Sequence, residues 1–216
     1  MSEIVTTYLL SDLDQPVPMG REEFYEEQIR IFKETGKPTR AMEVIQILLF
    51  TPDKDIILQK RSKFKNHNPS KIDKTIGGHI TFGDTPTFTV MAETLQEMQV
   101  ASFVLQTEDD FKRTYHLLKK HIGNSALIQF IDSRTYTSEK IINKETVKIA
   151  NRYHFYLGLY NGSIRPTDKE VSGILFYDYV TIQEEIRQKP ELFTADLKFL
   201  LDKYSAKIEI FLNNIS

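Results

Sequence analysis

Two carboxylates and an amide lie three or four residues apart near the middle of the chain, at Glu93, Gln96 and Glu97. An α-helix turns by about 100° per residue, so these side chains would share one face of a single helix. Their oxygen atoms are the hard ligands that Mg²⁺ takes, and Mg²⁺ keeps its remaining positions for water and substrate phosphates. The first hypothesis is therefore chemistry at a phosphate bond.

The helix that must carry these residues has a defined start. Thr85 can cap its N-terminus, and Pro86 suits the first turn, where a missing N–H costs nothing. The spacing predicts an apolar face opposite the acidic one, formed by Phe88, Met91, Leu95 and Met98. The alternative is that the glutamates are only the solvated face of an amphipathic helix.

The segment before the helix favours the chemical interpretation. Residues 73–79 predict a short strand that runs into the double glycine Gly77-Gly78. Because glycine has no side chain, the backbone there can offer a carbonyl oxygen to a metal ion.

The glycine and the acidic helix together resemble the Nudix box, whose family pattern is G-x5-E-x7-R-E-U-x-E-E-x-G-U, with U a bulky aliphatic residue. The matching positions are Gly78, Glu93, Glu97 and Val100. The departures are Asp84 for Glu, Ala92 for Arg, Thr94 for the aliphatic residue, Gln96 for Glu and Gln99 for Gly. The resemblance is thus to a degenerate form of the box.

This resemblance implies an α/β protein with a Nudix-like α/β/α sandwich and a mixed sheet. It implies that Glu93 and Glu97 are the principal metal ligands, with the carbonyl of Gly78 nearby and the third ligand at Gln96. A neutral amide keeps one oxygen ligand but removes a negative charge, so we expect weaker Mg²⁺ binding or a requirement for Mn²⁺. In the family the box arginine helps to orient the carboxylates, and Ala92 cannot make that interaction.

Segments outside the box extend the resemblance over roughly residues 40–205. They are an apolar hairpin at 41–50 and 55–62, a strand at 169–176 and a tail at 192–198. The tail is similar to that of the branch closest to isopentenyl-diphosphate isomerases. Isomerases of this type use a cysteine two residues before the box histidine. This chain has Gly77 there and no cysteine, so we do not expect that mechanism.

His79 and Arg61 are the predicted substrate-binding residues. His79 matches the metal-binding histidine of the isomerases, and it is interpreted as a ligand or phosphate contact or else as a turn residue. Arg61 belongs to a basic run at 60–65 that leads toward the box, where a guanidinium could bind phosphate oxygens bidentately. The alternative for this run is a solvated loop. Tyr153, Phe155 and Tyr160 could stack on a base, although alternating aromatic residues in a strand favour a core.

The composition fits an enzyme-sized domain. The 216 residues are 40% hydrophobic and 27% charged, which can form a substantial core. A net charge of −2 provides no electrostatic attraction for nucleic acid. The sequence has no apolar run long enough to predict a membrane span. The absence of cysteine excludes disulfides and thiol catalysis, and it fits a cytoplasmic protein.

The order of elements predicts an N-terminal appendage at residues 1–39, with a strand at 3–10 and a helix at 21–34 that ends at Gly36. Residues 40–216 are predicted to form the Nudix-like domain, with an insertion around 101–147. The insertion is predicted to hold a helix at 108–121, a strand at 126–134 and a polar connection at 135–146, before a strand at 152–160. It could set substrate choice or be a surface elaboration.

These observations predict a metal-dependent hydrolase that cleaves a small-molecule diphosphate, such as a nucleoside diphosphate derivative, with Mg²⁺ or Mn²⁺. The predicted catalytic residues are Glu93, Glu97 and Glu170, and the general base is either Glu93 or Glu170. The alternative function is a Nudix-fold binding or regulatory module that no longer cleaves its ligand; an isomerase-like enzyme is a third. We expect no nucleic acid or membrane partner. The N-terminal strand and helix could mediate a homodimer.

Overall fold

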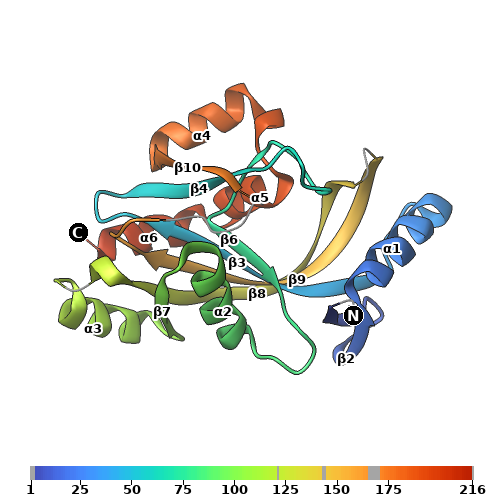
Figure 1. Cartoon of the computed structure of the whole chain (residues 1–216), viewed down its shortest axis with the longest axis horizontal. Helices are drawn as coiled ribbons and strands as arrows, with labels where there is room; N and C mark the ends of the chain where they lie inside the picture. The colour runs from blue at the N-terminus through green and yellow to red at the C-terminus, as the bar shows by residue number, and fades with distance from the viewer. Residues whose placement is uncertain (1–2, 121, 143–144, 165–170, 216) are drawn as a thin grey trace.

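A computed structural model describes residues 3–120, 122–142, 145–164 and 171–215. Its centre is a mixed sheet in the order β10-β4-β3-β9-β8-β7 (Figure 1). These strands are β3 (Arg40–Phe50), β4 (Asp55–Arg61), β7 (Ala101–Leu105), β8 (Ser125–Ile142), β9 (Glu145–Leu159) and β10 (Val171–Asp178). β3 runs parallel to β9, and β8 runs antiparallel to β9. The predicted α/β class and mixed sheet are confirmed.

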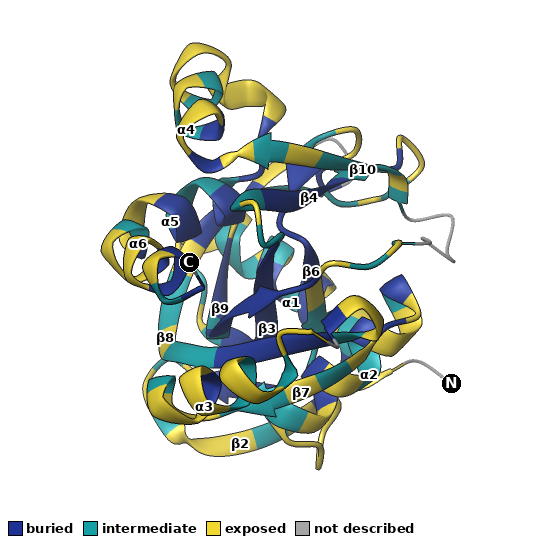
Figure 2. Cartoon of the chain, turned by 90° about the vertical axis from the view of Figure 1, so that its left-hand side faces the viewer, coloured by how far each residue is buried: buried dark blue, intermediate teal, exposed yellow. Residues whose placement is uncertain are grey.

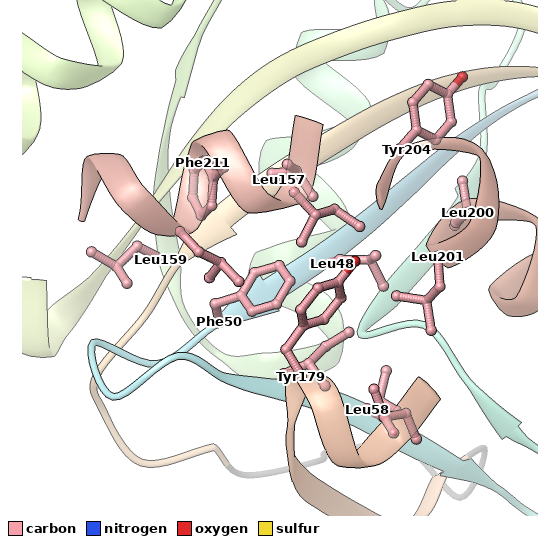
Figure 3. Close-up of a cluster of buried hydrophobic side chains, with 14 of the residues drawn as sticks. Leu48, Phe50, Leu58, Leu157, Leu159, Tyr179, Leu200, Leu201, Tyr204 and Phe211 are labelled. Carbon is pink, nitrogen blue, oxygen red and sulfur yellow. The ribbon is translucent and has the colours of Figure 1, made fainter. Parts of the chain in front are cut away.

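The central strand β3 is buried on both faces because its side chains alternate between two cores. Leu48 and Phe50 point into a cluster that the helices of one face complete, and Figure 3 shows this cluster with Leu157 and Phe211 packed around Phe50. Ile45 belongs to the second cluster, on the opposite face. A strand between two apolar layers has a continuous hydrophobic sequence, as residues 44–50 do.

Helices cover both faces of this sheet, which gives the sandwich its three layers (Figure 2). The first core packs against α3 (Glu108–Leu118), α4 (Tyr179–Gln188), α5 (Ala195–Lys203) and α6 (Ser205–Asn214). The second core packs against α2 (Pro86–Met98). No helix among the residues that the structure describes is long and apolar enough to cross a membrane.

The N-terminal segment forms the strand and helix predicted for it. β1 (Ile4–Leu9) pairs with β2 (Asp12–Gly20) and with the start of β3. α1 (Arg21–Thr35) ends at Gly36, which has a left-handed φ of 71° that glycine adopts without strain. Phe24 and Tyr25 of α1 pack in a third cluster with side chains of β9. A domain boundary near residue 39 stays a prediction.

The polar connection predicted at residues 135–146 is wrong. β8 continues to Ile142 and pairs with β9 from Glu145, so the two strands form a long arm that projects beside α1 (Figure 1). The arm is stable as a strand pair because Ile142 and Val147 pack in the third cluster, under α1. Thr137 and Glu139 are exposed on its outward side, whereas Ser138 between them is buried, so the alternation of the strand and not polarity decides which side chains face outward.

Among the described residues, two short strands and two 3₁₀ turns complete the fold. β5 (Ile72–Asp73) pairs with β4, and β6 (Ile76–His79) pairs with β3. The 3₁₀ turns are Ile122–Asn124 and Pro190–Leu192. The predicted helix at 108–121 ends earlier, at Leu118, and residue 121 lies outside the described residues.

Candidate functional site

The helix α2 begins where the sequence predicts. The Thr85 side chain accepts a hydrogen bond from the backbone N–H of Phe88 (3.2 Å), and Pro86 is the first helical residue. At the other end Gln99 has a φ of 57°, which is the left-handed conformation that glycine favours. The family's glycine at this position therefore has a structural reason, and this chain reaches the same geometry with glutamine.

The predicted apolar face of α2 is wrong except at Met98. Phe88, Met91 and Leu95 are about half exposed. The helix instead buries Val90, Thr94 and Met98 against the sheet. Thr94 is tolerated there because its hydroxyl bonds the carbonyl of Val90 (2.8 Å) and the hydroxyl of Ser102 (2.9 Å). The buried face is thus rotated, and Glu93 and Glu97 lie at its edge beside the sheet.

The double glycine makes room for two charged side chains. Gly77 and Gly78 lie within β6, so the predicted turn after the strand is not there. A methyl group on Gly78 would clash with the carboxylate of Glu93, and one on Gly77 would clash with the stem of Lys74. The strand can therefore hold a carboxylate and an ammonium close to its bare backbone.

Glu97 is fixed by a buried amide of β4. The Gln59 side chain donates a hydrogen bond from Nε2 to Oε2 of Glu97 (2.7 Å) and a second one to the carbonyl of Thr75. Gln59 is 9% exposed, so this bond lies at the inner wall of the site. The orientation of Glu97 is thus set by the sheet as well as by its own helix.

These groups line a cleft of about 800 Å³. It includes every predicted site residue that the structure describes, namely Arg61, Gly78, His79, Glu93, Gln96 and Glu97. Glu170, the second predicted base, lies outside the described residues. Residues on α1, on the loop after β4 and on the arm also line the cleft, among them Arg21, Tyr25, His67 and Lys140.

The donor set for a metal is two carboxylates, an amide and a backbone carbonyl. Within the described ranges, no group of three or more His, Asp or Glu side chains is arranged to hold a metal ion. The position that would supply a third carboxylate in the box is Gln96, which is exposed. Oxygen donors at Glu93, Glu97, Gln96 and the bare backbone of Gly78 still fit a hard cation, with one negative charge fewer than in the family pattern.

Arg61 lies in the cleft, but its hydrogen-bond donors bind other groups of the protein. Its Nε and Nη2 donate to the carbonyl of His67 (3.1 and 2.9 Å), and its Nη1 donates to Oδ2 of Asp73 (3.0 Å). Burial by itself would raise the pKa of Asp73. Lys74 and Arg61, with hydrogen bonds from Thr194 and from the Lys74 backbone, outweigh burial and hold that pKa well below its usual range. Asp73 is therefore an ionised anchor for both cations.

His79 lies in β6, not in a turn, and its Nε2 is 3.2 Å from the hydroxyl of Tyr25. The Tyr25 ring also contacts the ring of His67 edge-on, at 4.5 Å between centroids. Burial, with the nearby cations Arg21 and Lys140, lowers the pKa of His79 well below 6.5. Burial, then Lys140 and Arg61, lowers the pKa of His67 to about 4. Both imidazoles are thus neutral at pH 7.

The aromatic residues considered for base stacking belong to the core. Tyr153, Phe155 and Tyr160 are each 4% exposed or less. Sequence analysis missed Tyr25, His67, Lys74 and Lys140 as cleft residues, and it missed Gln59, which lines a smaller recess with Lys74 and Glu97. Lys74 lies three residues before Gly77, which is a usable signal. Lys140 has no such signal in the sequence, because only the folding of the arm brings it to the cleft.

No family model and no curated protein matches this sequence. Solved structures do. DR0079 from Deinococcus radiodurans superposes with a TM-score of 0.54 at 15% identity, over 75% of this chain and 82% of that one. The Nudix domain of Shewanella oneidensis NrtR, solved with ADP ribose, gives 0.48 at 12% identity, over 85% and 97%.

A bifunctional NMN adenylyltransferase/ADP ribose pyrophosphatase from Francisella tularensis, solved with AMP and a manganese ion, gives a TM-score of 0.49 at 10% identity. The match covers 87% of this chain and 47% of that one, so this chain spans about half of that protein. At such identities the likeness concerns the fold alone.

Proposed function

We propose that this chain, whose residues 78–100 resemble the Nudix box and whose fold is similar to that of DR0079, is a metal-dependent hydrolase of a diphosphate linkage, in a nucleoside diphosphate derivative or a related organic diphosphate. The observation that carries the proposal is the cleft, where Glu93 and Glu97 lie on one wall and Lys74 lies close by. Carboxylates to bind a cation and an ammonium to bind phosphate are the two requirements of this chemistry.

Glu93, Glu97, the amide oxygen of Gln96 and the carbonyl of Gly78 would hold Mg²⁺ or Mn²⁺. When bound, such an ion supplies charge neutralisation for the diphosphate and lowers the pKa of a coordinated water. Gln59 orients Glu97 through its 2.7 Å hydrogen bond. With one carboxylate fewer than the family pattern, the affinity for Mg²⁺ should be lower than a full box provides.

The other residues of the cleft bind and orient the substrate. Lys74 is held by Asp73, 3.4 Å from its Nζ, and it reaches past Gly77 toward the cleft, where it can donate to phosphate oxygens. His79 is neutral and shares a hydrogen bond with Tyr25, so it can serve as an uncharged contact. Glu93 is the candidate general base among the described residues. Glu170 remains the second candidate, tested by Glu170→Ala.

Phosphate and pyrophosphate release should be measured on a panel of nucleoside diphosphate derivatives, with Mg²⁺ and separately with Mn²⁺. We expect Glu93→Gln and Glu97→Gln to lower kcat by about a hundredfold or more, because each removes a charge from the metal site. Glu26→Gln is the matched control, since Glu26 is exposed on α1 and does not line the cleft. Full turnover in Glu97→Gln would overturn the proposal.

A binding or regulatory module is the second candidate, and the incomplete acidic set favours it. Described residues bring two carboxylates to the cleft wall at α2, and the third position is an amide. A binding module would bind its ligand in EDTA with equal affinity in the wild type and in Glu97→Gln. A hydrolase should need the metal, and Glu97→Gln should impair it.

A further inference from the structure

Lys140 is a cation from the arm that reaches the cleft. Its side chain is 11% exposed, and the carboxylate nearest to its Nζ is that of Asp196, at 3.9 Å. This separation exceeds hydrogen-bond distance, and no hydrogen bond to the Lys140 ammonium is present among the described residues. An ammonium has three donors, and Lys140 lines the cleft, where a ligand can supply acceptors for them. The group is therefore poised to bind an acceptor that enters the cleft.

The charge of Lys140 is maintained at neutral pH. Burial by itself would lower the pKa of Lys140, but Asp196, Tyr25 and Asp73 together outweigh this effect and raise it. Asp196 is itself fixed, because it accepts a hydrogen bond from the buried hydroxyl of Tyr153 (2.9 Å). The ammonium thus has a rigid counter-charge at a distance that leaves its donors available.

A loop locks this part of the arm in position. Asn68, in the loop at residues 62–71, donates its backbone N–H to the carbonyl of Ile141 and accepts the Ile141 N–H on Oδ1, both at 3.1 Å. His67 forms a β-bridge with Ile142. Lys140 directly precedes these residues, so its backbone is held before any ligand binds. Such preorganisation is what a specific binding residue requires.

Positive charge exceeds negative charge at this wall of the cleft. In the part of the chain that the structure describes, the ion pairs of Arg61, Lys74 and Lys140 involve two carboxylates, those of Asp73 and Asp196. The low pKa of His67 is consistent with this excess, because Lys140 and Arg61 contribute to it after burial. A phosphate group, an anion with several acceptor oxygens, would supply the acceptors that the Lys140 ammonium can bind.

We infer that Lys140 is a specificity-determining residue, which binds a further phosphate group that the substrate carries beyond the diphosphate held at Glu93 and Glu97. The inference rests on the proposed function, since it assigns a class to the substrate of the same cleft. It favours diphosphates with an additional phosphate over those that end in a neutral sugar or an apolar tail.

The test uses inorganic pyrophosphate as the probe, measured by calorimetry on the whole chain in EDTA. Without metal the carboxylates of α2 repel anions, so binding reports on the cationic wall alone. We expect Lys140→Met, which keeps the length of the side chain, to weaken binding about tenfold or more, as the loss of a charge-assisted hydrogen bond does. Lys148→Met is the matched control, because Lys148 is exposed on the paired strand and outside the cleft lining.

A second variant separates binding from a purely structural ion pair. Asp196→Asn still offers an oxygen to Tyr153 but removes the carboxylate that keeps Lys140 charged. We therefore expect Asp196→Asn to weaken pyrophosphate binding at pH 7.5 and to weaken it less at pH 6, where protonation of the ammonium is favoured. Unchanged binding in both Lys140→Met and Asp196→Asn, or no binding by the wild type, would overturn the inference. This binding test does not depend on turnover. If the separate hydrolysis assay finds no activity but pyrophosphate binding still depends on Lys140, the result counts against the proposed function alone.

Discussion

At Gly78 the backbone of β6 comes so close to the carboxylate of Glu93 that only a hydrogen atom fits between them. The same strand leaves room for Lys74 at Gly77. Two adjacent glycines thus bring opposite charges to one surface, which a strand with side chains could not do. At the scale of single residues, the site depends on the absence of side chains at Gly77 and Gly78 as much as on the groups that would bind a ligand.

Gly78→Ala should impair activity without unfolding the protein. The added methyl group would meet the flexible end of Glu93, so the carboxylate must move out of position, at a cost in stability of about 1–3 kcal/mol. We expect at least about a tenfold loss of kcat/KM, because small misplacements of reacting groups are costly. Gly173→Ala in β10 is the control, since nothing lies within 4 Å of its new methyl group. Equal activity in the two variants would contradict this account.

At the scale of elements, α2 shows how packing can override an apolar pattern. The sequence predicts that Phe88, Met91 and Leu95 face the core, yet the helix buries Val90 and Thr94. Burying that face brings Glu93 and Glu97 to the cleft. The hydroxyl of Thr94 finds two partners within its surroundings, which removes the penalty of burying it.

Two methionines on α2 test which face of the helix is buried. Met98 is 2% exposed and Met91 is 47% exposed. We expect Met98→Ala to lower the free energy of unfolding by about 2–5 kcal/mol, because it leaves a cavity in the second core. Met91→Ala should change it by less than about 0.5 kcal/mol. Urea denaturation followed by circular dichroism measures both, and a loss for Met91→Ala as large as that for Met98→Ala would show that the predicted face, to which both belong, is the buried one.

At the scale of the whole molecule, the cleft is an assembly of distant parts. α1 contributes Arg21 and Tyr25, the loop after β4 contributes His67, and the arm contributes Lys140. The arm is fixed to that loop at Ile141, whose backbone N–H donates to Asn68. The cleft therefore forms only when the N-terminal segment, the sheet and the arm are folded together, and its assembly should affect the stability of the entire chain.

The pH dependence of stability should show this coupling through His67. Its pKa is about 4 in the folded protein and near 6.5 when exposed, because of burial and then the nearby Lys140 and Arg61. Between these values the unfolded state binds more protons, so acid favours unfolding; above pH 6.5 the effect vanishes. We expect the contribution of His67 to reach about 2 kcal/mol at pH 5, on the order that linkage gives for such a shift.

Urea denaturation at pH 7.5 and at pH 5, on the wild type and on His67→Gln, measures this contribution. The wild type should lose more stability on acidification than the variant does, by the amount attributed to His67. The backbone carbonyl that Arg61 binds is retained in His67→Gln, so the loop keeps its main anchor. Identical losses in the two proteins would exclude His67 as the titrating group.

The amino-acid sequence by itself determined the features that depend on neighbours along the chain. Thr85 and Pro86 set the start of α2, Gly36 sets the end of α1, and the apolar run at 44–50 sets the central strand. The spacing of Glu93, Gln96 and Glu97 likewise follows from helix geometry, and their shared cleft agrees with it.

Only the tertiary structure decided which face of α2 is buried and that residues 135–142 are a strand. It also decided that Tyr25 and Lys140 enter the cleft. The physical reason is that these outcomes depend on contacts between segments far apart in sequence: α1 against the arm, Asn68 against Ile141, and β6 beside α2. No local pattern encodes such contacts, because each segment's own preference is weak compared with the burial that its distant partner provides.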